Sequence, residues 1–170
     1  MEANLLGIYL NDHLAGATAG VDRARHLARS CRGTASAPAV EEIATEIAQD
    51  RHSLTDLMEE LDVPARRYKV SAGWAAEKVG RLKANGRLVH RSPLSTLIEL
   101  EMLRVGVSGK LACWQALRRL SDTEGRLDPH RLDDLVRRAH RQLRTLEELH
   151  SQQVTTTFRT PELTGSGAPR

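Results

Sequence analysis

Hydrophobic residues recur along this chain at alternating spacings of three and four positions, which places them on one face of an α-helix. The first stripe of this kind consists of Leu6, Leu10, His13, Ala17, Gly20, Ala24, Leu27 and Cys31. It predicts a long helix over about residues 4–31. Because such a stripe faces neighbouring helices, we expect its histidine to point into a bundle of helices.

Three further stripes predict helices over about residues 38–63, 93–121 and 129–154, each opened by a proline in its first turn. The stripe of the second helix includes Asp50 among aliphatic residues, so we expect an acid on an inward face. The third helix is apolar around nearly its whole circumference, which is typical of a central helix. Val, Ile and Thr rarely alternate with polar residues, and this argues against a sheet.

A basic segment over residues 64–91 separates the second helix from the third. Heptad spacing in this segment predicts another helix, and its apolar positions are Tyr68, Ala72, Ala75, Val79 and Leu82. Its basic residues are Arg66, Arg67, Lys69, Lys78, Arg81, Lys83, Arg87 and Arg91, against the single acid Glu77. This composition is typical of a segment that binds phosphate groups of a nucleic acid. A solvated face that balances the acidic parts of the second and fourth helices is the alternative that we favour.

The connections between the helices indicate a topology. Short loops join the first helix to the second and the third to the fourth, so each pair is expected to be antiparallel. As a helix rising ~1.5 Å per residue, segment 64–91 is long enough to carry the chain back along the bundle, so that the second and third helices run parallel. The sequence therefore predicts an all-α, ferritin-like four-helix bundle over residues 1–154 with an additional helical crossover, followed by a disordered tail over residues 155–170.

Several strings support this topology by resemblance. YLNDHLAGATAG, IAQDR, AEKVGRLKANGRL and SPLSTLIELE, which lie within roughly residues 5–150, resemble a group of bacterial proteins with the same helical pattern and no established activity. In helix order and in its middle crossover the chain resembles the ferritin-like superfamily. The resemblance implies that a di-iron centre would take an acid from each of the first and third helices and a Glu-x-x-His pair from each of the others.

The chain offers part of such a ligand set. Its candidate metal ligands are Glu46, Glu101, Glu147 and His150. Counting residues from the helix ends places all four at one level of the bundle. Gln49 stands where a histidine ligand is expected, and Asp22, the acid at this level of the first helix, points away from the seam. Iron or manganese would suit the set, although we favour a carboxylate site without metal, or a simple polar pair of Glu101 and His150 near a bundle end.

His13 and Asp50 are the other polar residues on predicted inward faces. Their heights along the bundle differ by roughly 7 Å, and Asp56 is nearer to His13 in level. A buried aspartate must be paired or hydrogen-bonded, and Arg51 or a neighbouring histidine could serve. We interpret the two residues as polar groups that fix the register of the helices. A role in ligand binding or proton transfer is the alternative.

Small residues occur in the first helix, where Gly16 and Gly20 predict the close approach of a neighbouring helix. Cys31 and Cys113 each lie among apolar residues, so we expect two buried thiols rather than a disulfide, as in a reducing cytoplasm. The chain starts without a basic segment typical of a signal peptide. No apolar run approaches the ~20 residues that span a bilayer, so we expect no membrane partner.

These observations favour a cytoplasmic bundle without catalytic activity. We expect it to act through self-association or through binding a protein partner. Two alternatives stay open, namely a metal-binding bundle of the di-iron carboxylate type and a nucleic-acid-binding protein that uses segment 64–91.

Overall fold

The computed structural model describes residues 3–66 and 93–159 of the chain. These residues form four α-helices and no strand: α1 (Ala3–Ser30), α2 (Ala37–Glu60), α4 (Pro93–Leu120) and α5 (Pro129–Phe158). The prediction of an all-α fold with four long helices is therefore confirmed. In the described part of the chain, no helix combines the length and the apolar character that crossing a membrane requires.

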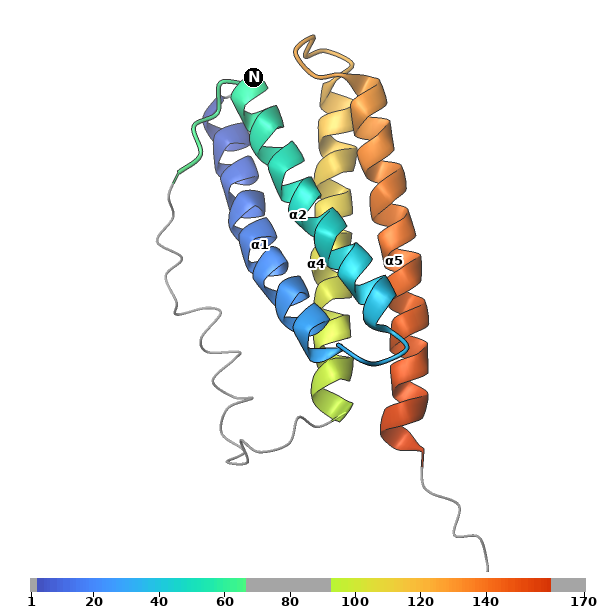
Figure 1. Cartoon of the computed structure of the whole chain (residues 1–170). Helices are drawn as coiled ribbons and strands as arrows, with labels where there is room; N and C mark the ends of the chain where they lie inside the picture. Colours follow the sequence, from blue (N-terminus) through green and yellow to red (C-terminus); the bar gives the residue numbers. More distant parts are fainter. Residues whose placement is uncertain (1–2, 67–92, 160–170) are drawn as a thin grey trace, which may run out of the picture.

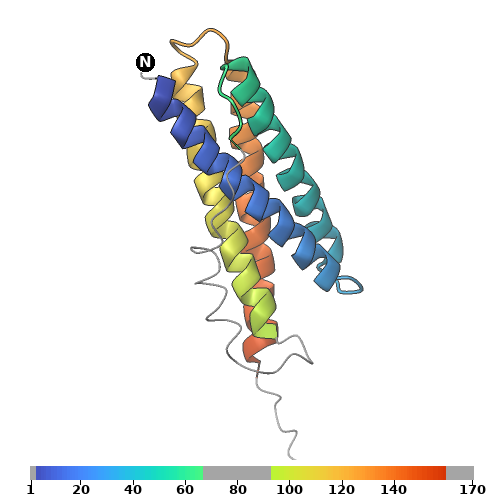
Figure 2. The ribbon, with the colours of Figure 1, turned by 90° about the vertical axis from the view of Figure 1, so that its left-hand side faces the viewer.

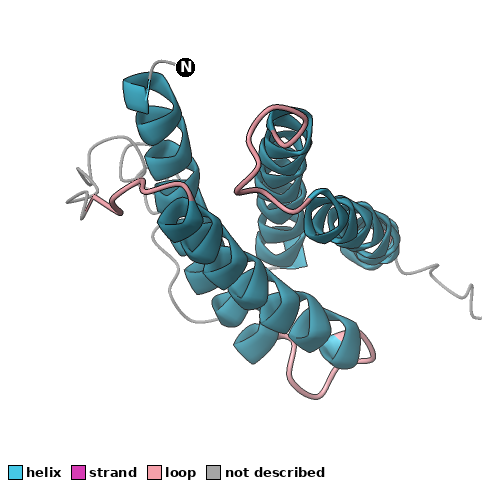
Figure 3. Ribbon diagram, turned by 90° about the horizontal axis from the view of Figure 1, so that it is seen from above, coloured by secondary structure: helices cyan, strands magenta, loops and turns pink. Residues whose placement is uncertain are grey.

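The helices form two antiparallel hairpins that pack against each other at an angle (Figure 1). One hairpin is α1–α2 and the other is α4–α5, and α1 lies across α4 between them (Figure 2). The views agree that α2 and α4 run in the same direction, as predicted. Figure 3 shows the two hairpins from above. α2 and α5 contact each other at only a few positions. The bundle is therefore held mainly along the α4–α5, α1–α2 and α1–α4 seams.

The apolar core lies where these helices pack together, and most of its large side chains are leucines. Its largest fully buried apolar side chains are Trp114, Leu10, Leu27, Leu57, Met58, Leu117, Leu132 and Leu146. Burying a side chain of this size stabilises the fold by roughly 1.5–3 kcal/mol relative to leaving it in water. Cys31 and Cys113 are buried and not joined in a disulfide, which confirms that prediction.

The ends of α2 and α5 differ from the predicted ones for local reasons. α2 ends at Glu60 because Asp62 adopts a left-handed backbone with φ 55°, and the next amide donates to Met58 O at 2.8 Å. Residues 63–66 are not helical, so the predicted crossover helix does not start at Pro64. α5 continues past residue 154 to Phe158. In this last turn the Thr155 hydroxyl donates a hydrogen bond to Ser151 O at 3.3 Å. The rest of segment 64–91, and the tail from residue 160, lie outside the described residues.

The inward face of α1 differs from the predicted stripe in its middle. Leu14 and Val21 are buried, whereas His13 and Gly20 are only half-buried at the edge of this face. A strict heptad drifts around a straight α-helix, which has 3.6 residues per turn, so the buried face shifts by one position. A Cβ built at Gly16 or Gly20 would meet no atom within 4 Å. Among the described residues, the close helix approach that these glycines predicted is therefore absent.

α4 was predicted to be central, and in this respect the prediction is wrong for the described residues. One side of α4 packs against α5 and α1, but its opposite side is open to solvent. Leu94, Met102 and Val105 lie on that side and keep 45%, 44% and 70% of their surface exposed. A helix that is apolar all round therefore lies at the edge of the described bundle.

The buried side-chain amide of Asn11 on α1 forms hydrogen bonds with the chain that follows α2. Asn11 is 3% exposed and sits on α1. Its Nδ2 donates to Gly7 O at 2.8 Å and to Pro64 O at 3.2 Å, and its Oδ1 accepts from the Arg66 amide at 2.7 Å. The chain that follows α2 is thus tied to the N-terminal half of α1.

We expect Asn11→Leu to destabilise the protein, because the side chain keeps its volume but leaves the backbone groups of Pro64 and Arg66 without partners. The loss should be about 1–2 kcal/mol, which lowers Tm by about 2–8 °C for a domain of this size. Thermal unfolding followed by circular dichroism measures it. Asp12→Leu, at the exposed neighbouring position, should leave Tm nearly unchanged. Equal losses in the two variants would contradict this role of Asn11.

Candidate functional site

The most deeply buried charge among the described residues is the carboxylate of Asp50 on α2. Its side chain is 1% exposed. Lys110 of α4 donates from Nζ to Asp50 Oδ2 and also to Gln142 Oε1 of α5, so one ammonium group joins three helices. Burial lowers the pKa of Lys110 below its usual value, while Asp50 opposes that shift. The prediction that Asp50 lies on an inward face and is paired is therefore confirmed, but Arg51 is not its partner.

Two more side chains complete this group, which we call the Asp50 cluster: Glu46, Asp50, Lys110, Arg138 and Gln142. Gln142 Nε2 donates to Asp50 Oδ2 at 3.1 Å and to Glu46 Oε2 at 2.8 Å. Arg138 Nη2 forms an ion pair with Asp50 Oδ1 at 2.7 Å. The cluster thus balances two carboxylates with two cations.

Sequence reasoning missed the partners of Asp50, although the pattern contained a signal for two of them. Lys110 and Gln142 occupy inward positions of α4 and α5, each three residues after one buried residue and four residues before another. A lysine or glutamine in a leucine stripe needs a buried polar partner, just as an aspartate does. Three polar interruptions on three stripes, at Asp50, Lys110 and Gln142, therefore pointed to one another.

His13 does not contact Asp50 and takes part in a separate contact on α1. Its imidazole packs edge-on against the ring of Tyr9, with ring centroids 4.5 Å apart. Burial lowers the pKa of His13, and the charge of Asp12 partly offsets that shift. Tyr9 in turn shares a hydrogen bond with Cys113, whose thiol pKa is raised to about 12 by burial. Cys113 is therefore a protonated, unreactive thiol at neutral pH.

The structure brings only part of the candidate metal set together. His150 Nε2 lies 3.2 Å from Glu101 Oε1, as their predicted common level required. Glu147 points to Arg104 at 3.7 Å and is 66% exposed, while Glu46 belongs to the Asp50 cluster. Within residues 3–66 and 93–159, no group of three or more His, Cys, Asp or Glu side chains is arranged to hold a metal ion. A polar Glu101–His150 pair is what the described residues show.

The predicted level of Glu46 was wrong because the two hairpins are offset along the bundle. The prediction assumed that α2 and α4 begin at the same height. In Figure 1, α4 and α5 instead extend beyond the loop that joins α1 to α2. Glu46 therefore lies beside Gln142, two helical turns, or about 12 Å, from His150.

The predicted phosphate-binding residues of segment 64–91 lie outside the described residues, apart from Arg66. They are Arg67, Lys69, Lys78, Arg81, Lys83 and Arg87. The backbone amide of Arg66 donates to Asn11, and its side chain is exposed.

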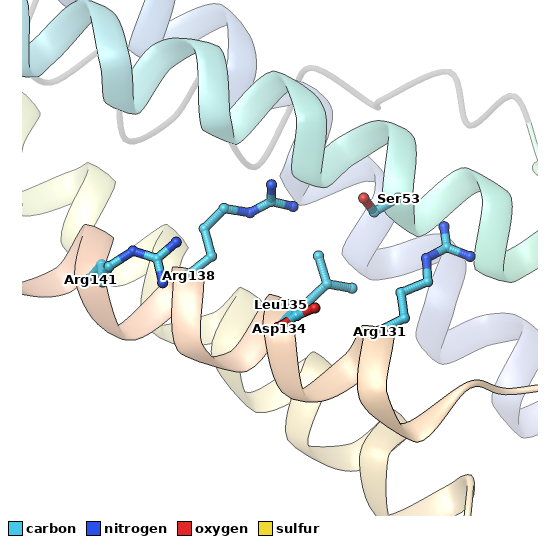
Figure 4. A pocket seen from close by; sticks show the side chains of 6 residues that line it. All are labelled: Ser53, Arg131, Asp134, Leu135, Arg138 and Arg141. Carbon is cyan, nitrogen blue, oxygen red and sulfur yellow. The ribbon is translucent and has the colours of Figure 1, made fainter.

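A shallow pocket of about 280 Å³ opens between α2 and α5 beside the Asp50 cluster. Its lining residues are Ser53, Arg131, Asp134, Leu135, Arg138 and Arg141. Figure 4 shows Arg131 and Arg138 reaching from α5 towards α2. Arg131 pairs with Asp56 at 3.1 Å and Glu60 at 2.6 Å, and Arg138 pairs with Asp50. Carboxylates of α2 therefore neutralise two of these arginines, and the pocket is chiefly a seam of ion pairs between two helices that otherwise touch little.

We expect Asp50→Leu to destabilise the protein by about 3–5 kcal/mol, because Lys110 and Arg138, which are largely but not fully buried, would lose this counter-charge. Adding Lys110→Met should recover at least about 1 kcal/mol of that loss, since the double variant buries one charge fewer. Urea unfolding measures both values. Glu147→Ala, which removes an exposed carboxylate, should change stability by less than about 1 kcal/mol. Additive losses for Asp50→Leu and Lys110→Met would contradict the coupling.

We expect His13 to make the fold sensitive to mild acid. Because its folded-state pKa lies below 6.5, the unfolded chain binds a proton there first as the pH falls. Stability should therefore fall from about pH 6.5 downwards until the pH has passed the lowered folded-state pKa. His13→Gln should remove this part of the pH dependence, measured by urea unfolding at each pH. His52→Gln, at an exposed histidine of α2, should keep the wild-type slope, and an unchanged slope in His13→Gln would contradict the assignment.

Comparisons with known proteins do not indicate a family for this chain. No protein-family model matches the chain, and no curated protein and no solved structure matches it.

Proposed function

We propose that this protein is a cytoplasmic, ferritin-like helical bundle that acts by binding another protein chain through the exposed side of α4. The helix order supports the ferritin-like assignment, because α1–α2 and α4–α5 are antiparallel hairpins and α2 runs parallel to α4. The proposal of binding rests on one observation, which is the chemistry of the exposed side of α4.

That side of the helix, which we call the α4 outer face, carries one continuous apolar stripe. Its members are Leu94, Ile98, Met102, Val105, Gly109, Ala112 and Ala116. They repeat at spacings of three and four, and all are exposed except Ile98, which is half-buried. Large apolar side chains gathered on one exposed stripe mark an interaction surface, because water hydrates them at a free-energy cost.

The α4 outer face also lacks charge over much of its length. Between Arg104 and Arg118 every exposed residue of α4 is uncharged, and the one charged residue in this stretch, Lys110, turns its ammonium group to Asp50. Charged residues are depleted at the centres of protein interfaces, whereas they dominate ordinary solvated helix faces. The α4 outer face therefore resembles the centre of an interface.

The polar groups of the Asp50 cluster have a structural role where side chains of α2 contact those of α4 and α5. In the Asp50 cluster the two carboxylates are balanced by two cations, and each contact joins different helices. We infer that the cluster fixes the register of α2 against α4 and α5, which keeps α4 in place as a rigid platform.

Accessibility of a thiol on the α4 outer face tests the proposal. In the full chain carrying Val105→Cys, we expect a permeant maleimide to react several-fold more slowly in the cells that naturally produce the protein than in dilute purified protein. The native thiols, Cys31 and Cys113, are buried and give little background. Thr45→Cys, at an exposed position of α2, is the matched control and should react equally in both settings.

Equal labelling of Val105→Cys in cells and in dilute solution would show that nothing covers the α4 outer face, and would overturn the proposal. Protection that persists in dilute purified protein would also overturn it, because the cover would then belong to the same chain.

A further inference from the structure

We propose that the partner of the α4 outer face is a second copy of this chain, bound with the two α4 helices antiparallel across a twofold axis near Val105. This inference rests on the proposed function and names the partner that the function requires. The distribution of large and small residues along the face, the positions of its charges and its size carry the inference.

Residue size changes along the α4 outer face. Its large side chains, Leu94, Ile98 and Met102, lie in the N-terminal half of the helix. Its small residues, Gly109, Ala112 and Ala116, lie in the C-terminal half, and Val105 lies between the two groups. One half of the face therefore projects and the other half is flat.

In an antiparallel pair, the projecting half of one copy faces the flat half of the other copy. With Val105 near the twofold axis, Leu94 of one copy meets Ala116 of the other, Ile98 meets Ala112, and Met102 meets Gly109. Each projecting side chain thus packs on a flat stretch, and the interface is the same patch on both copies, as twofold symmetry requires. A parallel pair would instead set leucine against leucine at one end and alanine against alanine at the other, which leaves a gap between the small residues.

Glycine on the exposed side of a helix also fits this contact. A Cβ at Gly106 or Gly109 would meet no atom within 4 Å, so no packing within the described residues requires glycine there. Glycine lowers helix stability relative to alanine, and here it leaves the backbone open to close approach. Interaxial distances at the low end of the 8–10 Å range need such residues on one side of the contact.

The charges that flank the face give the same orientation. Glu101 and Arg104 border its N-terminal half, whereas no exposed residue of its C-terminal half between Arg104 and Arg118 is charged. In the antiparallel pair Glu101 lies beside Gly109 and other uncharged residues of the other copy, while Arg104, which pairs with Glu147 of its own chain, lies next to the twofold axis. A parallel pair would place Glu101 beside Glu101, and like charges in register oppose association.

The size of the face predicts a weak dimer. From Leu94 to Ala116 the stripe extends about 33 Å along the helix and is about 10 Å wide. Such a strip is well below the about 800 Å² per partner of a standard stable interface, so a dimer that uses the strip alone is weak. We therefore expect dimerisation to be reversible and to depend on protein concentration.

Sedimentation and cross-linking of the full chain test the arrangement. We expect the sedimentation coefficient to rise with protein concentration, and Val105→Cys to form a covalent dimer with a short bifunctional maleimide. A mixture of the Leu94→Cys and Ala116→Cys chains should cross-link, whereas Leu94→Cys alone should not, because its two copies would lie about 33 Å apart.

A variant at a glycine tests the contact without disturbing the fold. Gly109→Leu should weaken dimerisation roughly tenfold or more, because the added side chain occupies the space that Met102 of the other copy needs. Gly16→Leu on α1, where a Cβ likewise meets no atom within 4 Å, is the matched control and should leave the dissociation constant unchanged. Circular dichroism should show that both variants fold.

The outcomes separate this inference from the proposed function. Cross-linking of Leu94→Cys to itself would show a parallel pair and overturn the antiparallel arrangement. A monomer at every concentration, combined with protection of Val105→Cys in cells, would overturn self-association but leave binding of a different protein in place. A monomer without protection in cells would overturn both.

Discussion

The arrangement of this bundle depends on the pairing of one buried carboxylate. α2 contacts α5 along few positions, so apolar packing alone fixes it only weakly against the α4–α5 hairpin. Asp50 supplies the missing constraint, because its carboxylate is satisfied only when Lys110 and Gln142 are at the same height. A shift of α2 by one turn would bury an unpaired charge, which costs several kcal/mol. The packing of α1 on α4 joins the two hairpins, and the polar contacts of Asp50 fix the register of α2 against the α4–α5 hairpin.

This constraint explains why polar and apolar residues have separate tasks in the molecule. The polar groups on the inward faces hold the hairpins together, and ion pairs such as Arg131 with Asp56 and Glu60 continue that role at the surface between α2 and α5. The apolar residues are distributed between the core and the α4 outer face. Since α4 is fixed by α5 on one side and α1 on another, its exposed stripe is held rigid, and a rigid surface loses little conformational entropy on binding.

The candidate metal set shows where reasoning from a sequence reaches its limit. The heights of Glu101 and His150 were predicted correctly because both residues belong to one hairpin with a short loop, so counting from that loop gives their relative level. The height of Glu46 was wrong because it belongs to the other hairpin, whose offset no local pattern encodes. Distances within a hairpin follow from residue counts, but distances between hairpins depend on how their surfaces pack.

The four helices, their approximate ends and the inward position of Asp50 follow from the amino-acid sequence alone, because helix periodicity and proline are local properties of the chain. Only the tertiary structure decided which polar groups meet and which apolar side of α4 stays exposed. Those features depend on the rotation and axial offset of each helix relative to its neighbours, and these are set when all the helices pack together. A periodic stripe predicts that a helix has a face to bury, but a helix such as α4, with apolar residues all round, carries no local signal that tells its buried side from its open one.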